Sequence, residues 1–516
     1  MSRFRRMAHN VASSYVSLIA ASVFSLATVP LALHYLGAES GRFALWLLMS
    51  AITGYMSLID LGMSASVARL LIDFKDRRDD GEYGSLIKTG WLVLLVQAGI
   101  ILGAGLGLAP VLAWVLKIDP GLRTEFIGLM GWQSASLALL FVLRIFSHVL
   151  NAHQRGDISN YGQVFGFGLN FLLMWLFFRA GHGVFSLAWA TILTNLYGGL
   201  VCLGAVWRLQ LLPVRSGWGR VSGARFRELF RYGQDTFLVA LGAQLIVASQ
   251  ILIIQRTLGS VSATLWGVGT RTFTLVSQLI WRISDTAAPA FSEMIVRNER
   301  EKLQTRFRES VILTGSLSGF FAVGFALCNS TFVSVWTHGT IVWPRINDVG
   351  LAAWLMVTSV LRCHNLLILY TKQIGFMRYV FFLEGLLFVA AASLTAKTGG
   401  FLAIISCSIA CSCLFSGAYG IWRASRYLGK TAGELVFGWQ RLMGRTILLS
   451  VPVALGTWFL ARQFESPTLQ LGIGTVTYGA LGLGIFLRFG LPQNVRHELS
   501  HRAPLVFQPL LGWIRA

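Results

Sequence analysis

The chain has 516 residues, of which 55% are hydrophobic and only 13% are charged, and its formal net charge is +21. Soluble globular proteins carry about 25% charged residues, so this composition excludes an ordinary soluble domain. The positive charge alone would fit nucleic-acid binding, but the basic residues lie in short loops between apolar segments, which argues against that class. We therefore expect a polytopic membrane protein and no nucleic-acid partner.

Apolar segments long enough to cross a bilayer recur along the whole chain. A span needs about 20 mostly apolar residues, because the hydrocarbon core is about 30 Å thick and a helix rises 1.5 Å per residue. The first segment is too long for a signal-peptide core, so we predict that it is retained. The sequence predicts about fourteen spans, at 11–33, 43–66, 89–114, 126–147, 158–178, 184–206, 235–254, 262–290, 310–336, 349–370, 379–396, 400–422, 445–461 and 469–490.

The distribution of basic residues predicts the orientation of these spans. Most of the 43 lysines and arginines fall in the amino-terminal segment, in alternate loops and in the carboxyl-terminal tail. The positive-inside rule then places both termini in the cytoplasm. The same side chains are expected to contact anionic membrane lipids.

The predicted second span carries a row of polar residues. Steps of three and four residues separate its members, which places them on one face of a continuous helix. A charge at the bilayer centre costs about 3 kcal/mol, and such residues usually face a bundle interior or a water-filled cavity. We therefore predict a cavity wall with Asp60 as either a protonation switch or the anchor of an arginine. The row consists of Ser50, Thr53, Ser57, Asp60 and Ser64.

The predicted eighth span repeats this pattern with Arg271, Thr274, Gln278, Arg282 and Asp285. Arg271 has no acidic neighbour on its helix, so we expect it to line a cavity. Arg282 and Asp285 either neutralise each other or contribute to the same cavity wall. Second and eighth spans correspond if the chain contains two related halves of six spans, and such repeats enclose the substrate site in many transporters.

This repeat predicts an all-α polytopic fold with two pseudo-symmetric six-helix bundles around a central cavity, followed by two additional helices. No predicted loop can hold a catalytic domain, so we expect no enzymatic activity. The predicted divisions are an amino-terminal half at 1–206, a cytoplasmic linker at 207–234, a second half at 235–422, a cytoplasmic loop at 423–444, the two additional helices at 445–490 and a cytoplasmic tail at 491–516.

Two further charges lie in a predicted helical hairpin that turns near residue 374. Arg362 and Glu384 are about equally far from the turn, so the sequence predicts an intramembrane ion pair between them.

The motif HELSH at 497–501 has the spacing of a zinc signature. It stands in the tail without an obvious third ligand, so no metal site is predicted.

Several of these segments resemble the polysaccharide-export flippases of the multidrug/oligosaccharidyl-lipid/polysaccharide (MOP) superfamily. In the segment 36–69, Glu39, Gly41 and Trp46 match an E-x-G…W element, and IDLG at 59–62 matches a D-L-G element. The second half agrees through LGSVSATLWGVGTRT at 258–272 and APAFSEMIVRNEREKLQTRF at 288–307. The aromatic residue that often precedes the glycine is replaced by Ser40 in this chain.

The resemblance implies a Wzx-like flippase in a bacterial inner membrane. Such proteins move an undecaprenyl-diphosphate-linked oligosaccharide (an O-antigen, exopolysaccharide or capsule repeat unit) from the inner to the outer leaflet by alternating access. The resemblance implies that no cofactor is needed. It implies that transport is coupled to a proton gradient, a sodium gradient or the membrane potential. It also implies glycan polymerases or glycosyltransferases as partners. The alternatives are a cation-coupled multidrug exporter of the same superfamily, which an unpaired Arg271 disfavours, and a membrane-embedded glycan polymerase or ligase.

Overall fold

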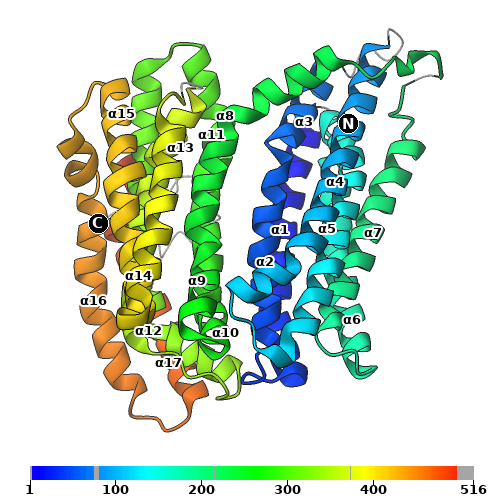
Figure 1. The fold of residues 1–516 in the computed structure, drawn as a ribbon. Helices are drawn as coiled ribbons and strands as arrows, with labels where there is room; N and C mark the ends of the chain where they lie inside the picture. Colours follow the sequence, from blue (N-terminus) through cyan, green and yellow to red (C-terminus); the bar gives the residue numbers. More distant parts are fainter. Residues whose placement is uncertain (1–2, 75–80, 214, 372–373, 497–516) are drawn as a thin grey trace. The chain divides into compact units, whose positions relative to one another are not determined.

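In the computed structural model, residues 3–74, 81–213, 215–371 and 374–496 are described, and they form helices and connecting loops without a β-strand. The predicted all-α class is thus confirmed. The chain divides into two compact units, Met1–Thr264 and Leu265–Ala516, which are described in turn (Figure 1).

The described helices include twelve stretches that are long and apolar enough to cross a membrane. The longest, Met377–Leu428, has 52 residues and contains the non-helical Gly400, so the predicted spans 379–396 and 400–422 both fall within it. The predicted span 262–290 is not among the twelve, and the count of fourteen is not confirmed. Large apolar side chains such as Trp114 and Val476, each 72% exposed, cover the outer surfaces, as a lipid solvent favours. The chain is a multi-pass membrane protein.

Unit 1 contains the helices α1 to α9 and the first half of α10. The helix pairs α4–α5, α5–α7, α6–α7 and α1–α6 pack against each other. Small residues permit this packing: a Cβ atom on Gly105 of α4 would lie 1.7 Å from Oγ of Ser134 in α5. The elements are α1 (Arg3–Leu36), α2 (Arg42–Ser57), η1 (Leu58–Asp60), α3 (Met63–Phe74), α4 (Glu82–Val115), η2 (Pro120–Leu122), α5 (Arg123–Ala152), α6 (Gly156–Arg179), α7 (Phe185–Arg208), η3 (Arg215–Trp218), α8 (Gly223–Val247), α9 (Ser249–Leu258) and α10 (Ser260–Gly269).

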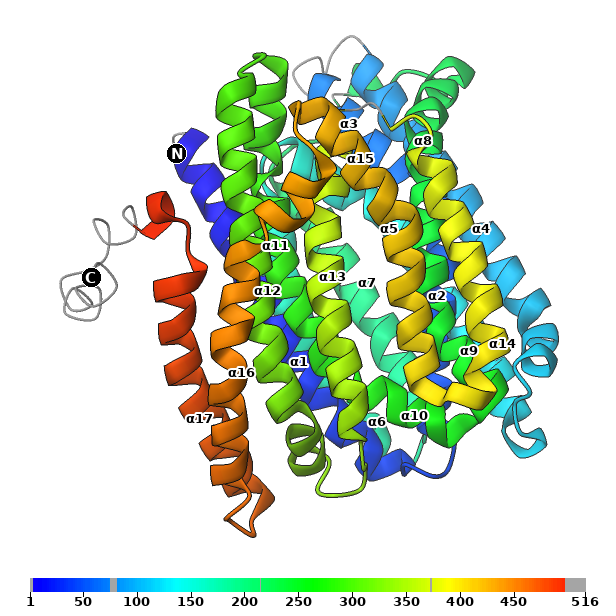
Figure 2. The same cartoon turned by 90° about the vertical axis from the view of Figure 1, so that its left-hand side faces the viewer.

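Unit 2 is built around α12, which packs against α11, α13, α16 and α17. Figure 2 shows α16 and α17 side by side next to α12. Three short π-helical segments, η4 to η6, interrupt or end its helices. The elements are α11 (Arg271–Val296), α12 (Arg300–Trp336), α13 (Arg345–Tyr370), α14 (Met377–Ser412), η4 (Cys413–Gly417), α15 (Ala418–Leu428), η5 (Glu434–Gly438), α16 (Arg441–Ala461), α17 (Pro467–Ile485) and η6 (Phe486–Gly490).

Unit 2 has an apolar core, and the carboxylate of Asp348 is fully buried. Its core includes Phe291, Phe307 and Trp439, all at most 5% exposed. The carboxylate of Asp348 accepts hydrogen bonds from Nδ2 of Asn329 and Nε1 of Trp343, both at 2.7 Å. These bonds satisfy a charge that would otherwise be costly to bury, so Asp348 ties α12 to α13.

The finer domain boundaries stay predictions. The predicted linker at 207–234 contains η3 and the first residues of α8. The predicted loop at 423–444 contains the end of α15, all of η5 and the start of α16.

Candidate functional site

The predicted second span is broken at Asp60. Helix α2 ends at Ser57, a short 3-10 turn follows, and α3 begins only at Met63. Leu61 and Gly62 have φ angles of 49° and 74°, in the left-handed region, where a helix cannot continue. The prediction that all five polar residues share one continuous helix is therefore wrong: Ser50, Thr53 and Ser57 lie on α2, whereas Ser64 lies on α3.

A side chain of α4 satisfies the backbone at this break. Nε2 of Gln97, which is only 3% exposed, donates to the carbonyl oxygens of Ile59 at 3.0 Å and Asp60 at 3.1 Å. Non-helical backbone at membrane depth requires such partners, because an unpaired carbonyl in an apolar environment costs several kcal/mol. Gln97 therefore stabilises the interruption.

The carboxylate of Asp60 connects this break to α3 and α5. It accepts hydrogen bonds from the backbone N–H of Ser64, at 3.2 Å, and from the Ser64 hydroxyl. Nη1 of Arg144 lies 4.0 Å from Oδ1 of Asp60 and donates to Oγ of Ser64 at 3.3 Å. Arg144 also lies over the ring of Phe141, 4.4 Å from its centroid. An arginine thus stands beside Asp60, as one of the two alternatives for Asp60 requires, while the role of the pair stays a prediction.

The hydroxyl groups of α2 donate hydrogen bonds to backbone carbonyls of their own helix. Ser50 donates to the carbonyl of Trp46, Thr53 to that of Met49 and Ser57 to that of Gly54. Their oxygen lone pairs are left as acceptors, and Ser50 is exposed. This row therefore presents acceptors that suit a donor such as a sugar hydroxyl.

A neutral pocket in unit 1 was not predicted. It has a volume of about 510 Å³, and its described lining carries amides, hydroxyls and aromatic rings but no ionisable carboxylate or basic group. Phe24 and Phe167 stack within it, with centroids 5.2 Å apart. Its lining comprises Phe24, Trp46, Leu140, Ser147, Asn151, Ser159, Asn160, Gly162, Gln163, Gly166, Phe167, Asn170, Met174, Leu187, Thr191, Thr194, Asn195, Tyr197, Gly198, Gly199 and Cys202.

Neighbouring helices hold the amides of this pocket, which we call the neutral pocket. Asn170 donates to Thr194 at 3.1 Å, and Asn195 donates to Ser136 at 2.9 Å. Each bond uses one amide proton and leaves the carbonyl oxygen of the same side chain for another partner. A sequence signal for the pocket existed: Asn160, Gln163 and Asn170 share a helical face by spacing. None of the three is charged, so this face carries no side chain whose burial in a membrane is costly enough to indicate a cavity from the sequence alone.

In unit 2, the predicted polar row lies on the single helix α11. Thr274, Gln278 and Asp285 are exposed, and Arg271 and Arg282 are half-buried. Core residues such as Phe273 and Phe291 occupy the opposite side. The predicted spacing therefore places these five residues along one helix and away from the packed interior of unit 2.

Arg271 stands without a counter-charge at the start of α11. Among the described residues it forms no ion pair, and its Nε, although buried, has no hydrogen-bond acceptor. Leaving such a donor unsatisfied costs about 1–3 kcal/mol. The position is therefore suited to an anion supplied by a ligand.

The predicted ion pair between Arg362 and Glu384 is wrong. Nη2 of Arg362 in α13 donates to Oδ1 of Asp285 in α11 at 2.9 Å, and its guanidinium lies over the ring of Trp281 at 4.8 Å. Oε1 of Glu384 instead accepts from the Ser412 hydroxyl at 2.9 Å. The prediction compared only the depths of the two residues along their helices, whereas their directions around the helix axes decide which groups meet.

Glu384 has a structural partner that only the folded chain reveals. Its Oε2 accepts from the backbone N–H of Ser416 at 3.0 Å, within the π-helical segment η4. Glu384 is 1% exposed, so these bonds satisfy a buried carboxylate.

The HELSH motif at 497–501 lies outside the described residues. Among the residues that are described, no group of three potential metal ligands occurs.

The sequence matches the polysaccharide biosynthesis protein family over residues 46–337, more than half of the chain. This range contains both Asp60 and Arg271. Among curated proteins, none matches the chain.

Solved structures with a similar fold include membrane transporters and a flippase. The lipid II flippase MurJ in an inward closed conformation has a TM-score of 0.64 at 12% identity, over 93% of this chain and 98% of that chain. A multidrug resistance MATE family transporter of the MOP superfamily is similar in its inward-facing conformation, with a TM-score of 0.63 at 15% identity over 80% of this chain and 96% of that chain. Its outward-facing counterpart has a TM-score of 0.59 at 15% identity, over 82% and 96%.

These likenesses show the fold, and the sequence match shows the family. Together they confirm the resemblance inferred from the segments at 36–69 and 258–307. The chain belongs to the polysaccharide biosynthesis protein family and has the fold of the MOP-superfamily flippases and transporters.

Proposed function

We propose that the protein is a flippase that moves a polyprenyl-diphosphate-linked oligosaccharide from the inner to the outer leaflet of a bacterial inner membrane. The cargo would be an O-antigen, exopolysaccharide or capsule repeat unit. The observation that supports this proposal most directly is the cationic face of unit 2, defined by Arg271, Arg282 and Arg362 with Asp285 as its carboxylate. Arg362 is paired with Asp285, whereas Arg271 forms no ion pair among the described residues and so adds a positive charge to this face.

The cationic face suits a diphosphate. A diphosphate cannot cross hydrocarbon unaided, because removing its charges from water is very costly. Arginine is permanently charged and binds phosphate oxygens with two parallel hydrogen bonds. Arg271 can form such bonds without first breaking an ion pair, since none is formed among the described residues.

The neutral pocket of unit 1 suits the sugars of the same cargo. Sugar hydroxyls donate and accept hydrogen bonds, and amides such as those of Asn170 and Asn195 do both. The stacked rings of Phe24 and Phe167 add an apolar surface on which a sugar ring can lie. A site with mostly apolar walls and a few placed polar groups is typical of small-molecule pockets.

Transport by alternating access needs no covalent step, so we propose that the protein is not an enzyme and uses no cofactor. The cargo needs only to bind more tightly to one state than to the other, and the energy input sets the direction. A proton gradient, a sodium gradient or the membrane potential would supply that input. The pair of Asp60 and Arg144 is the candidate for a charge that changes between states.

The alternative of a multidrug exporter for organic cations has less support. Such a protein needs carboxylates in its binding pocket, and the described lining of the neutral pocket has none. The cationic face of unit 2 would repel a cation. A glycan polymerase or ligase would need catalytic groups in an outer loop, which the chain was not predicted to have.

The proposed setting follows from the basic loops. Both termini would be cytoplasmic, where glycosyltransferases assemble the lipid-linked cargo, and a polymerase on the opposite side would receive it. Anionic membrane lipids would surround the basic ends of the helices.

Purified protein reconstituted in vesicles tests the proposal directly. We expect it to move a polyprenyl-diphosphate-linked oligosaccharide between leaflets, measured as the fraction accessible to an added glycosidase. Arg271→Ala should slow this movement by about tenfold or more, because a charge-assisted bond to phosphate contributes about 1.5–3 kcal/mol. The matched control is Arg297→Ala, since Arg297 follows the same helix but is exposed and paired with Glu293 at 2.6 Å.

Two results would contradict the proposal. Unchanged transport by the Arg271→Ala protein would remove this arginine from the substrate path. Failure of the wild-type protein to move any lipid-linked oligosaccharide, under conditions where it moves organic cations, would favour the exporter.

A further inference from the structure

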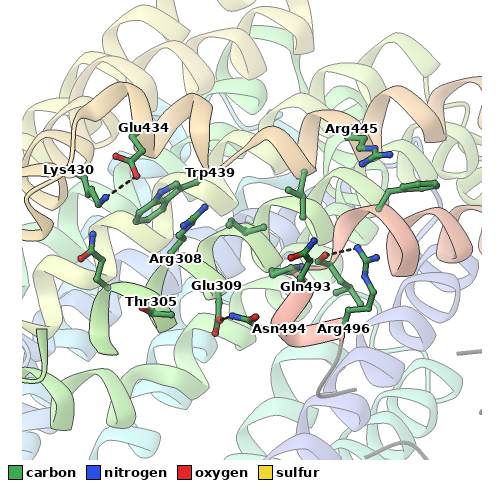
Figure 3. Close-up of a pocket in the computed structure, with 16 residues that line it drawn as sticks. Thr305, Arg308, Glu309, Lys430, Glu434, Trp439, Arg445, Gln493, Asn494 and Arg496 are labelled. Atoms are coloured by element: carbon green, nitrogen blue, oxygen red, sulfur yellow. Dashed lines mark hydrogen bonds and ion pairs between the residues drawn. The ribbon is translucent and has the colours of Figure 1, made fainter. Parts of the chain in front are cut away.

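A second cavity lies at one end of unit 2, far along the helices from the middle of the apolar spans. It has a volume of about 530 Å³ and is formed by the first turns of α12, the segment from Lys430 to the start of α16, and the segment from the end of η6 to Arg496 (Figure 3). Two apolar spans begin here and a third ends here, so the cavity lies where the spans meet the membrane surface. Its lining comprises Gln304, Thr305, Arg308, Glu309, Ile312, Lys430, Glu434, Trp439, Leu442, Arg445, Phe489, Leu491, Pro492, Gln493, Asn494 and Arg496.

Both carboxylates of the cavity are already engaged. Glu434 pairs with Lys430 at 3.3 Å, as the dashed line in Figure 3 marks. Glu309 pairs with Arg306 at 3.0 Å and accepts a bond from Asn494 at 2.9 Å. Their charges are therefore balanced by residues other than the three arginines of the lining.

These three arginines come from three separate segments of unit 2. Among the described residues, Arg308 forms no hydrogen bond or ion pair. Arg445 stacks on the ring of Phe489 at 4.5 Å, and Arg496 donates one bond to the carbonyl of Leu491 at 3.3 Å. Within the described part of the chain, the lining therefore holds three positive charges without a carboxylate partner, and it is suited to an anion.

Two buried donors of the lining also lack acceptors. Trp439 is 1% exposed, and its Nε1 has no hydrogen-bond partner among the residues that the structure describes. Nε of Arg496 is buried and likewise unpaired. Buried donors are almost always satisfied, so two of them beside a cationic cavity indicate that an acceptor from outside the chain belongs there.

An apolar stripe runs along α16 directly from the cavity. Arg445 is followed at helical spacing by Leu448, Val451, Leu455 and Phe459, which are 73%, 39%, 52% and 63% exposed. Steps of three and four residues place them in one row on the helix. A cationic cavity at the membrane surface that continues into an exposed apolar row matches the two parts of a phospholipid.

We propose that this cavity binds the phosphate-containing headgroup of an anionic phospholipid, with the acyl chains along the Leu448–Phe459 row. The phosphate would accept bonds from Arg308, Arg445 and Trp439. Such a lipid would join α12, α16 and the segment after η6, and it would be a resident lipid rather than the transported cargo. This inference does not depend on the proposed flippase activity.

Native mass spectrometry of the purified full-length protein tests the proposal without a transport assay. We expect phosphatidylglycerol to stay bound where phosphatidylcholine does not, because only the former has a net negative headgroup. The variant R308A/R445A should bind phosphatidylglycerol about tenfold or more weakly. The matched control is Arg462→Ala, since Arg462 stacks on Trp458 at 4.0 Å at the opposite end of α16 and should leave binding unchanged.

Two further controls separate the outcomes. R308K/R445K keeps both positive charges but loses the planar guanidinium groups, which bind phosphate with two parallel hydrogen bonds. Its affinity for phosphatidylglycerol should therefore lie between those of wild type and R308A/R445A. This variant shows whether weak binding by R308A/R445A results from misfolding. Inorganic phosphate should not displace the lipid at millimolar concentration. Equal binding of both phospholipids, equal loss in Arg462→Ala, or displacement by phosphate would each overturn the assignment of an anionic lipid to this cavity.

Discussion

The guanidinium of Arg362 in α13 lies 2.9 Å from the carboxylate of Asp285 in α11. Both side chains are partly exposed, at 36% and 40%, so the pair lies on an accessible surface of unit 2 rather than in its core. An ion pair of this kind contributes little to stability, about 0–1 kcal/mol. The pair of Arg362 and Asp285 lies beside Arg282 on the cationic face. We therefore infer that this pair determines how much positive charge the face presents to a ligand.

Loss of this pair should impair transport without unfolding the protein. Asp285→Arg adds positive charge and removes the partner of Arg362, so release of a diphosphate should be slowed and export of surface glycan reduced. The double variant D285R/R362D restores the pair in the opposite direction, and we expect it to recover part of the lost export. The measurements are surface glycan in a deletion strain and protein abundance in its membranes.

Glu384 provides the matched control for that exchange. Charge reversal in E384R/R362E should not rescue either single variant, because Glu384 contacts Ser412 and Ser416 instead of Arg362. Rescue by E384R/R362E, together with failure of D285R/R362D, would show that the pairing in the membrane differs from the one described above.

Gln97 should be necessary for the stability of the broken helix. Gln97→Leu keeps the size of the side chain but removes the donor to the carbonyls of Ile59 and Asp60. We expect the free energy of unfolding to fall by about 1–3 kcal/mol, because a buried acceptor is left unpaired. Thermal unfolding of the purified protein in detergent measures this effect.

Gln470 offers the same interaction in an exposed setting. Its Nε2 donates to the carbonyl of Phe464 at 2.8 Å, where water can replace it. Gln470→Leu should therefore change the free energy of unfolding by less than about 0.5 kcal/mol. If the two variants unfold at the same temperature, Gln97 does not stabilise the break.

The fold class and the polar face of α11 were predictable because both depend on regular helical spacing. Long apolar segments can only be spans, and residues three and four apart on α11 share a face wherever the helix is continuous. The break at Asp60 was not predicted, because Leu61 adopts a left-handed conformation that few sequence patterns reveal. Gly62, two residues after the aspartate, was the only local signal for it.

Contacts between helices were harder to predict than positions along them. Arg362 and Glu384 lie at similar depths, but the choice between Asp285 and Glu384 as the partner depends on how α13 is rotated. The cavity of Arg308, Arg445 and Arg496 combines three segments far apart in the sequence. Only the packed unit brings them together.

Asp60 should affect transport more than folding. Asp60→Asn keeps an oxygen that can accept the bond from the Ser64 N–H but removes the charge beside Arg144. We expect slower transport at normal protein abundance, with a weaker dependence on pH than in wild type. Wild-type behaviour of this variant across the pH range would exclude proton coupling through Asp60, and Arg144 would then be its structural partner only.

The neutral pocket should discriminate cargo by its sugars. Asn195 donates to Ser136 and leaves its carbonyl oxygen available, so Asn195→Leu removes an acceptor from the pocket while keeping the side-chain volume. The diphosphate has no reason to contact this neutral lining. The effect of the substitution should therefore depend on whether the carrier bears an oligosaccharide.

Vesicle transport of two cargoes measures this dependence. With Asn195→Leu, movement of the oligosaccharide-linked polyprenyl diphosphate should slow by about tenfold, since one hydrogen bond to a sugar contributes about 1 kcal/mol and the lost polar partner adds to it. Movement of the same carrier without sugars should be unchanged. Gln463→Leu, at an exposed position in unit 2, serves as the control and should slow neither cargo. Equal slowing of both cargoes by Asn195→Leu would show that the pocket does not bind sugar, because a general defect in conformational exchange would affect them alike.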